Sequence, residues 1–451
     1  MEARPMRLTL CAFAYCLLAL QAAAAADYKV EETLLGVVDL NYKTPVISRD
    51  GRHLAYTIEK DKKWRAVIDC RPGPEFDQIV EGSLTFSPDG NRSAYAGVSG
   101  GKVFVVIDGK PGAAYDGIAS GSPMFSPDSE HVAYVALKGD KQLVVVDGSP
   151  GPEFEGIVDG SLTFSATGGR VGYAAGKGDK RVAVVDGKAG PEYDRVDSIV
   201  FSHDGKRVAY RAGNGGKAFI VIDGKPGPGY AAVGPLAFSP NGGRKAYAVS
   251  DGKQEWVLFD GKPSPRYDVV GAIVFSPDSK HAAYAAAKGR KQFVVIDGTP
   301  GSAYDAIRDG SITFSADSNH VAYSAAKGDK CFQVVDGVPG PGYDAIGTFV
   351  FSPDGSRFAY AAQEGGKSIV VVDGVPGSKV DRLGNLAFSP DGRHIAYSAR
   401  EGAAWHVVID GVPGRDYVFV ANSGPSYNPD GSLEYLAIKD ESLYRVKQIP
   451  E

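Results

Sequence analysis

The hydrophobic and polar positions of this chain follow one short pattern that returns along almost its whole length. An apolar or aromatic anchor is followed by a turn resembling Ser-Pro-Asp-Gly. In the first ten copies a tyrosine stands nine positions after the anchor and an aspartate twenty-two positions after it. Successive anchors lie either thirty-seven or thirty-nine positions apart, at Ile47, Phe86, Phe125, Phe164, Phe201, Phe238, Phe275, Phe314, Phe351, Phe388 and Tyr427. The pattern predicts eleven tandem copies of one supersecondary unit, the last of them truncated.

Within a unit, the periodicity is typical of strands. Apolar runs at 84–86, 93–97, 102–107 and 115–118 are separated by turns rich in Gly, Pro and Asp. No stretch of ten residues has a helical period, and β-branched residues crowd the runs. We therefore expect an all-β fold, a β-propeller built from about eleven four-stranded antiparallel repeats, each repeat forming one blade.

The recurring Phe and Tyr residues are predicted to form the core between blades. A single blade cannot bury both faces of its sheet, so neighbouring blades must stack against each other. An aromatic ladder that contacts a ligand is the alternative interpretation.

The phrase F-S-P-D-G-x-x-x-A-Y, found at Phe351–Tyr360 and again at Phe388–Tyr397, resembles the WD40-like repeat of TolB-type propellers. The resemblance covers essentially all of residues 27–451, and it implies a propeller fold. TolB has an additional N-terminal α/β domain, whereas only about twenty residues separate the predicted leader from Ile47 here.

The two ends of the repeat array complement each other. The unit that begins at Tyr427 lacks its fourth strand, and the segment Glu32–Leu40 is a surplus apolar strand before the first unit. If the two ends share a blade, two exposed sheet edges disappear. Eleven blades in one ring and two consecutive rings of five and six both fit this arithmetic. A ring of eleven would be unusually large, because propellers typically have 4–8 blades. The lack of a linker between units favours one ring.

Residues 1–26 are predicted to be a secretory signal peptide. Arg4 and Arg7 precede an apolar run, Leu8–Leu20, and small residues end at Ala26. The run of about 13 residues is short for a bilayer span, and no later stretch approaches 18 apolar residues. We expect a periplasmic or secreted chain without a transmembrane segment after cleavage; an uncleaved anchor is the alternative.

The composition of the chain limits which classes of binding partner are expected. The chain has 49 basic and 54 acidic residues, a net charge of −5, which gives no general attraction to nucleic acid. Hydrophobic residues make up 43 %, enough for a core and too many for disorder. Two of the four cysteines lie in the predicted leader, and the other two, Cys70 and Cys331, are expected on opposite faces and therefore unpaired.

The two faces of the predicted disc differ. The Ser-Pro-Asp-Gly and Asp-Gly-x-Pro-Gly turns share one face, named here the Asp-Gly face, for example at 87–90 and 108–112. Aspartates in the first kind of turn are expected to bond their own backbone, and examples are Asp89, Asp128, Asp278 and Asp354. Calcium binding is a weaker alternative, because Ca²⁺ takes 6–8 oxygen ligands. We assign the difference between the two anchor spacings to turns on the other face.

That other face, named the lysine face, holds the candidate binding residues. The turn between the second and third strands carries a lysine sixteen positions after the anchor in eight units: Lys63, Lys102, Lys141, Lys180, Lys217, Lys291, Lys330 and Lys367. A solvated rim that discourages edge pairing is one interpretation. The other is an electropositive ring that attracts an anionic glycan, a peptide or an envelope protein.

Trp64 and Trp405 stand one position after this lysine site, in units that ring closure would bring together. An exposed Trp is a candidate contact residue, since aromatic anchors dominate binding surfaces. Cys331 occupies the same site and would be an accessible thiol. Packing against a loop is the alternative for both tryptophans.

Enzyme motifs are weak in this sequence. Gly97–Gly101 matches G-x-S-x-G, but it lies at a hairpin tip rather than between a strand and a helix. Five histidines recur six positions after the anchor, one per blade, where they are expected to face solvent: His53, His131, His281, His320 and His394. We predict a non-enzymatic binding scaffold with no metal or cofactor; a lyase or hydrolase with its site in the central channel is the alternative.

Overall fold

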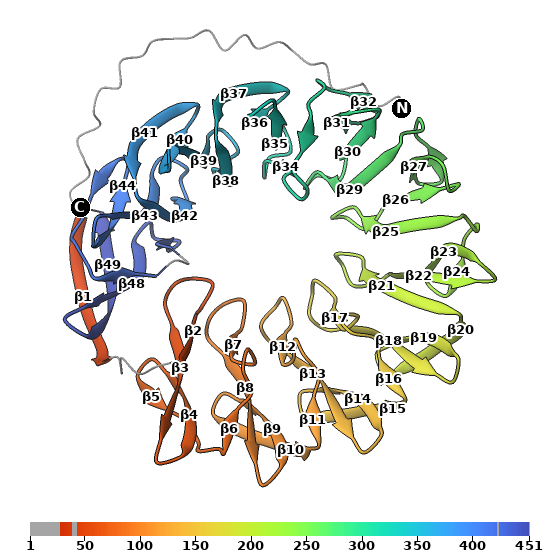
Figure 1. Ribbon diagram of the computed structural model, residues 1–451, viewed down its shortest axis with the longest axis horizontal. Helices are drawn as coiled ribbons and strands as arrows, with labels where there is room; N and C mark the ends of the chain where they lie inside the picture. Colours follow the sequence, from red (N-terminus) through yellow and green to blue (C-terminus); the bar gives the residue numbers. More distant parts are fainter. Residues whose placement is uncertain (1–27, 38–42, 422–423, 451) are drawn as a thin grey trace.

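The computed structural model describes residues 28–37, 43–421 and 424–450, so the predicted signal peptide lies outside the described residues. Eleven small antiparallel sheets surround a central opening in one ring (Figure 1). The described residues contain strands and turns and include no helix that is long and apolar enough to cross a membrane. The prediction of an all-β propeller with about eleven four-stranded repeats is confirmed.

Each blade is a meander whose first strand borders the central opening (Figure 1). We number the blades 1 to 11 in chain order. The innermost strands are β2 (Lys43–Ile47), β6 (Gln78–Ile79) with β7 (Thr85–Phe86), β11 (Gly117–Ile118) with β12 (Met124–Phe125), β16 (Gly156–Ile157) with β17 (Thr163–Phe164), β21 (Arg195–Phe201), β25 (Ala232–Phe238), β29 (Val269–Phe275), β33 (Ala306–Ile307) with β34 (Thr313–Phe314), β38 (Ala345–Phe351), β42 (Arg382–Phe388), and β46 (Phe419–Val420) with β47 (Ser426–Tyr427).

The second and third strands form the central hairpin of each blade. The second strands are β3 (Leu54–Lys60), β8 (Ser93–Ser99), β13 (Val132–Lys138), β18 (Val171–Lys177), β22 (Val208–Asn214), β26 (Lys245–Ser250), β30 (Ala282–Lys288), β35 (Val321–Lys327), β39 (Phe358–Glu364), β43 (Ile395–Glu401) and β48 (Leu433–Lys439). The third strands are β4 (Lys63–Ile68), β9 (Lys102–Ile107), β14 (Lys141–Val146), β19 (Lys180–Val185), β23 (Lys217–Ile222), β27 (Glu255–Phe259), β31 (Lys291–Ile296), β36 (Lys330–Val335), β40 (Lys367–Val372), β44 (Ala404–Ile409) and β49 (Ser442–Pro450).

In blades 2 to 10 the outermost strand follows an Asp-Gly turn in which both residues have positive φ, such as Asp108 (50°) and Gly109 (77°). In blade 1 Cys70 takes the place of the glycine. These strands form the rim: β5 (Arg71–Pro72), β10 (Lys110–Tyr115), β15 (Ser149–Phe154), β20 (Lys188–Tyr193), β24 (Lys225–Pro226), β28 (Lys262–Pro263), β32 (Thr299–Pro300), β37 (Val338–Tyr343), β41 (Val375–Val380) and β45 (Val412–Pro413). In blade 11 the outermost strand is β1 (Tyr28–Val37).

The ring closes through β1, which pairs antiparallel with β49 from Tyr28↔Pro450 to Val37↔Ser442. The surplus strand before the first unit therefore completes the last blade, starting four positions earlier than expected. Glu32 fastens this strand to blade 10, because its carboxylate accepts a hydrogen bond from the hydroxyl of Tyr417 at 2.8 Å. Both ends of the described chain are thereby held in one sheet.

The recurring aromatic residues lie between blades, as predicted. The tyrosines nine positions after the anchor are almost fully buried, among them Tyr95, Tyr134 and Tyr360. Many of them meet an aromatic ring from the end of the preceding blade edge to face, as Tyr134 meets Tyr115 with ring centroids 6.1 Å apart. Such aromatic contacts add to the burial of apolar area in holding two blades together.

The difference between the two anchor spacings lies in the innermost strand, not in a turn on the lysine face. Each blade that follows the longer spacing has an innermost strand divided into two short pieces, whereas each blade that follows the shorter spacing has one continuous bulged strand. Four of the divisions carry x-Gly-Ser, and in blade 2 the hydroxyl of Ser83 donates to the carbonyl of Val80 (2.6 Å) and accepts from the amide of Ala96 (3.0 Å). The assignment of this difference to a turn on the lysine face was therefore wrong. The turn that makes the spacing longer lies within the innermost strand and interrupts its pairing with the second strand.

Candidate functional site

The aspartate of the Asp-Gly turn organises the Asp-Gly face of its blade. In blade 2, Asp108 accepts hydrogen bonds from the amide of Ser93 (3.0 Å) and from Nε of Arg92 (2.9 Å). The guanidinium of Arg92 lies over the ring of Phe125 in blade 3, 5.4 Å from its centroid, and donates to the carbonyl of Glu130 at 2.6 Å. This side chain therefore joins two neighbouring blades.

The five recurring histidines take the place of this arginine. Each places Nδ1 2.6 Å from the aspartate carboxylate of its own blade, in the pairs His53–Asp69, His131–Asp147, His281–Asp297, His320–Asp336 and His394–Asp410. The hydrogen bond to Asp147 raises the pKa of His131. We expected these histidines to face solvent and did not predict a carboxylate partner. The partner was missed because the aspartate belongs to the following turn of the blade.

Aspartates of the Ser-Pro-Asp-Gly turns bond their own turn, as predicted. Asp89 accepts from the hydroxyl of Ser87 (2.5 Å) and from the amide of Asn91 (3.1 Å). The hydroxyls of Ser352 and Ser356 likewise hold the pKa of Asp354 down at about 2. Among residues 28–37, 43–421 and 424–450, no three His, Cys, Asp or Glu side chains come together in a way that could hold a metal ion.

The circle of lysines is largely a circle of ion pairs. Six of the eight pair with an aspartate that follows the rim segment of the same blade: Lys63–Asp77, Lys102–Asp116, Lys180–Asp194, Lys291–Asp305, Lys330–Asp344 and Lys367–Asp381. The same aspartate also accepts from a glycine amide of the next blade, as Asp77 accepts from Gly100 at 2.9 Å. The hydrogen bond with Lys63 lowers the pKa of Asp77 and raises that of Lys63. In these six blades the positive charge is balanced.

Two candidate lysines differ from the other six. The described part of the chain shows no ion pair for Lys141 or Lys217, and the position equivalent to the pairing aspartate holds Glu155 and Ala231 respectively. Glu155 keeps the bond to the next blade, accepting from the amide of Gly178 at 3.0 Å. A role of the eight lysines in binding stays a prediction. Lys141 and Lys217 are the two that have no aspartate at the pairing position to balance their charge.

The tryptophan site is more buried than expected. Trp405 is only 8 % exposed and lies with Tyr417 and Tyr435 in the core between blades 10 and 11. Trp64 is half-buried and pairs through its backbone with Phe76. The expectation of an exposed contact at Trp405 was wrong, because the last residues of a blade fold back over this position. Cys331 and Cys70 are half-buried free thiols.

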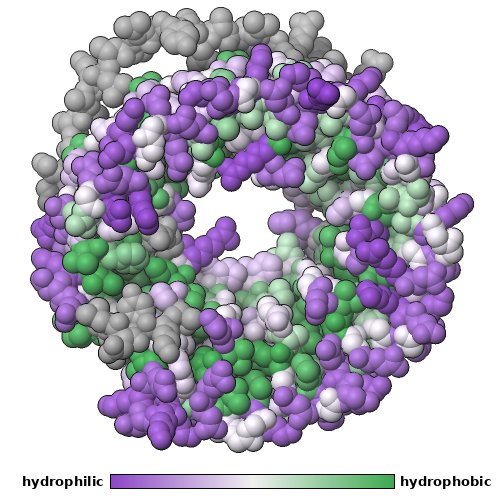
Figure 2. All heavy atoms as spheres, in the orientation of Figure 1, coloured by the Kyte–Doolittle hydropathy of each residue, from purple (hydrophilic) through white to green (hydrophobic). Residues whose placement is uncertain are grey.

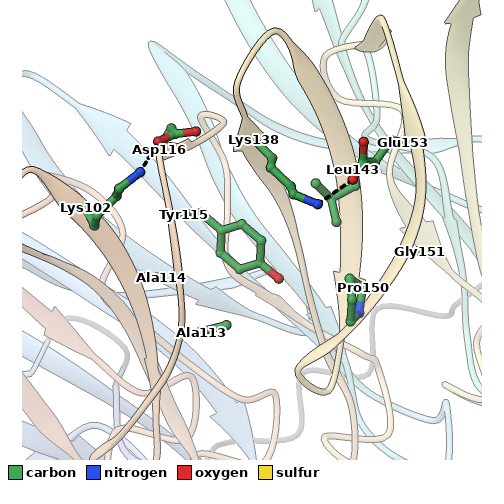
Figure 3. A pocket seen from close by; sticks show the side chains of 10 residues that line it. All are labelled: Lys102, Ala113, Ala114, Tyr115, Asp116, Lys138, Leu143, Pro150, Gly151 and Glu153. Atoms are coloured by element: carbon green, nitrogen blue, oxygen red, sulfur yellow. Dashed lines mark hydrogen bonds and ion pairs between the residues drawn. The ribbon is translucent and has the colours of Figure 1, made fainter.

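A cleft of about 430 Å³ lies between the rim strands β10 and β15 of blades 2 and 3 (Figure 3). Tyr115 lies between its two sides, and the ion pairs Lys102–Asp116 and Lys138–Glu153 flank it. Small apolar residues line much of the remainder: Ala113, Ala114, Leu143, Pro150 and Gly151.

Sequence reasoning missed this cleft, although a signal is present. Ala113-Ala114 in blade 2 stands where blade 3 has Pro152-Glu153 and blade 4 has Pro191-Glu192. Two methyl groups fill much less space than a proline ring and a glutamate side chain. Both alanines line the cleft, and their small side chains leave space between the two rim strands.

The central opening passes through the disc (Figure 2). Unlike the recurring residues, the exposed positions of the innermost strands, and of the turns that divide some of these strands, differ from blade to blade. They include Glu81, Ser120, Asp159, Pro235, Asp309, Thr348 and Asn385. The opening is thus a second surface at which the repeats are not equivalent.

No family model and no curated protein matches this chain. Among solved structures it is similar to "the eukaryotic initiation factor" at 14 % identity, over 73 % of this chain and 96 % of that one, with a TM-score of 0.44. It is also similar to TolB from Acinetobacter baumannii (15 % identity, 57 % and 77 % covered, TM-score 0.28) and to the Dos1 propeller (11 %, 73 % and 89 %, 0.34). None of these names transfers a function to this chain.

Proposed function

We propose that this protein is a non-enzymatic binding scaffold, exported by its N-terminal segment to the cell envelope or the exterior, where it binds a protein, a peptide or an anionic glycan. One observation carries the proposal: the residues that recur from blade to blade are used in contacts between or within blades. Specific binding must then come from places where a blade departs from the repeat.

The cleft between blades 2 and 3 is such a place. It combines a small apolar lining with two ammonium and two carboxylate groups, from Lys102, Lys138, Asp116 and Glu153. Apolar lining with a few polar groups at its margin is the usual make-up of a recognition site. A peptide segment that carries both apolar and charged side chains suits this lining.

The alternative is a lyase or hydrolase with its site in the central opening. It would require titratable groups that converge from several blades. The exposed acidic residues of the split innermost strands, Glu81, Asp159 and Asp309, come from blades 2, 4 and 8, which are separated around the ring (Figure 1). This arrangement favours binding over catalysis.

The proposal is tested by affinity capture from envelope extract and culture medium with immobilised residues 27–451. Ala114→Trp fills the cleft, and Ala303→Trp makes the same change at the equivalent rim position of blade 7. A partner retained by the wild type and by the Ala303 variant but lost with the Ala114 variant supports the cleft. Equal retention by all three contradicts the cleft, and a wild type that retains nothing contradicts the scaffold.

A further inference from the structure

The rim position that follows each Asp-Gly turn differs in charge around the ring. Blades 4, 5 and 6, which are consecutive (Figure 1), place an exposed lysine there: Lys188, Lys225 and Lys262. We name these three residues the basic arc. The part of the chain that the structure describes shows no ion pair for any of them. In blades 7, 8 and 9 the same position holds an uncharged residue: Thr299, Val338 and Val375.

The other basic side chains in the turns of blades 4 to 6 on the Asp-Gly face have carboxylate partners. Each arginine pairs with the aspartate of its own Asp-Gly turn, in the pairs Arg170–Asp186, Arg207–Asp223 and Arg244–Asp260. The ammonium group of Lys206 lies 3.4 Å from the carboxylate of Asp204. The charge that remains in these turns is therefore that of the basic arc.

Neighbouring sectors of the Asp-Gly face have opposite net charge. Two blades of the basic sector lack the carboxylate of the Ser-Pro-Asp-Gly turn, because Thr167 and Asn241 take its place. With histidines neutral, seven Lys or Arg and four Asp residues give the turns of blades 4 to 6 a net charge of +3, at 165–170, 186–190, 202–207, 223–227, 239–244 and 260–264. The equivalent turns of blades 7 to 9 contain two Lys or Arg and six Asp residues, a net charge of −4. An anion that approaches this face is drawn to the basic arc and repelled by the sector beside it.

The surroundings of the basic arc favour one class of anion. The turns of blades 4 to 6 contain small and polar residues and no large apolar side chain. Protein and peptide partners are usually held by buried aromatic or aliphatic anchors. A flat anionic bilayer would also meet the acidic turns of blades 7 to 9 on the same face. A flexible hydrophilic polyanion needs neither an apolar anchor nor a uniformly basic face, because it can follow the three lysines along the rim.

We propose that the basic arc binds an anionic polysaccharide, whose charged groups lie against the ammonium groups of Lys188, Lys225 and Lys262. Stacked sheets are about 10 Å apart and diverge towards the rim of a ring, so the polymer must bear charges along a length that spans several such separations. The inference rests on the proposed function, because it makes an anionic glycan a partner of the scaffold. It places that partner on the Asp-Gly face, away from the cleft between blades 2 and 3.

Binding of fluorescent dextran sulfate, with uncharged dextran as the control polymer, tests the proposal. The arc variant combines Lys188→Thr, Lys225→Thr and Lys262→Thr. Threonine occupies this rim position in blade 7, so the melting temperature should not change. The control variant makes the same change of net charge on the lysine face, with Lys102→Thr, Lys180→Thr and Lys291→Thr. Affinity is measured by fluorescence anisotropy at low and at physiological salt.

We expect the arc variant to bind dextran sulfate at least tenfold more weakly than the wild type, and the control variant to stay within about twofold of the wild type. The affinity of the wild type should fall as salt is added, because salt screens exposed charges. Equal losses in the two variants would show attraction to net charge alone and would overturn the proposal, as would a wild type that does not bind dextran sulfate.

Two further probes separate the polysaccharide from other anions. Tighter binding of phosphatidylglycerol vesicles or of poly-L-glutamate than of dextran sulfate would overturn the proposal and assign the arc to a lipid surface or an acidic peptide. Ala114→Trp, which fills the cleft, should leave dextran sulfate binding unchanged. A loss with Ala114→Trp and none with the arc variant would place the anion in the cleft, so that the scaffold proposal would stand while the arc failed.

Discussion

Gly73 at the rim of blade 1 lies so close to Tyr95 of blade 2 that a β-carbon on the glycine would be 2.9 Å from the tyrosine hydroxyl oxygen. The tyrosine is almost fully buried, and burial raises its pKa to about 12. Gly73 therefore makes room for the core of the next blade. At equivalent glycines such as Gly112 and Gly227 the atom nearest to an added β-carbon is instead a carbonyl oxygen of the same blade.

We predict that Gly73→Ala lowers the free energy of unfolding by about 1–3 kcal/mol, the usual cost of overpacking a filled core. The matched control is Gly227→Ala at the same position of blade 5, where the added carbon meets only the carbonyl of Ile220 at 3.2 Å. Both variants are compared by urea unfolding. An equal loss in the two would show that the tyrosine hydroxyl is not the limiting contact.

Charge reversal on the lysine face should depend on the partner aspartate. Lys102→Glu places a carboxylate beside Asp116, whereas Lys217→Glu has Ala231 at the corresponding position. We expect the Lys102 variant to have the lower melting temperature, and added salt to reduce the difference, because exposed charges are screened. Melting temperatures measured at low and high salt check this. A difference that salt leaves unchanged would indicate a steric rather than an electrostatic cause.

The pair His131–Asp147 should make stability depend on pH. The hydrogen bond to Asp147 raises the folded-state pKa of His131 above its ordinary value of 6.5. The stabilisation is therefore complete below that value and is lost as pH rises through the folded-state pKa. His131→Arg, which installs the residue found at this position in blade 2, should remove this part of the pH dependence. Melting temperature is measured against pH for both proteins, and parallel curves would contradict the assignment.

The stability of the protein should be sensitive to a charge added to strand β1 only where the side chain packs against the neighbouring blade. Val30→Asp puts a carboxylate into the cluster with Trp405 and Val446, and we expect a loss of about 1–3 kcal/mol from burying an unpaired polar group. Val37→Asp makes the same change where the side chain is 67 % exposed, and its effect should stay within about 0.5 kcal/mol. Chemical denaturation of both variants measures the difference. Similar losses at the two positions would mean that β1 is not packed against blade 10.

The repeat pattern was sufficient to predict the propeller, the aromatic core between blades, the turn aspartates such as Asp89 and the completion of the last blade by an N-terminal strand. These features depend on local periodicity and on turn chemistry, which the units repeat. A regular alternation of apolar residues and Gly-Pro-Asp turns admits few arrangements, and stacking is the one that hides both faces of each sheet.

The tertiary structure alone decided which side chains meet within and across the blades. It paired Lys63 with Asp77, gave His53 the carboxylate of Asp69, buried Trp405, and opened the cleft beside Ala114. These contacts depend on how the hairpins of a blade lie side by side, on how far one blade is rotated relative to the next, and on the volume of individual side chains. None of these quantities has a period along the chain, so the repeat pattern could not supply them.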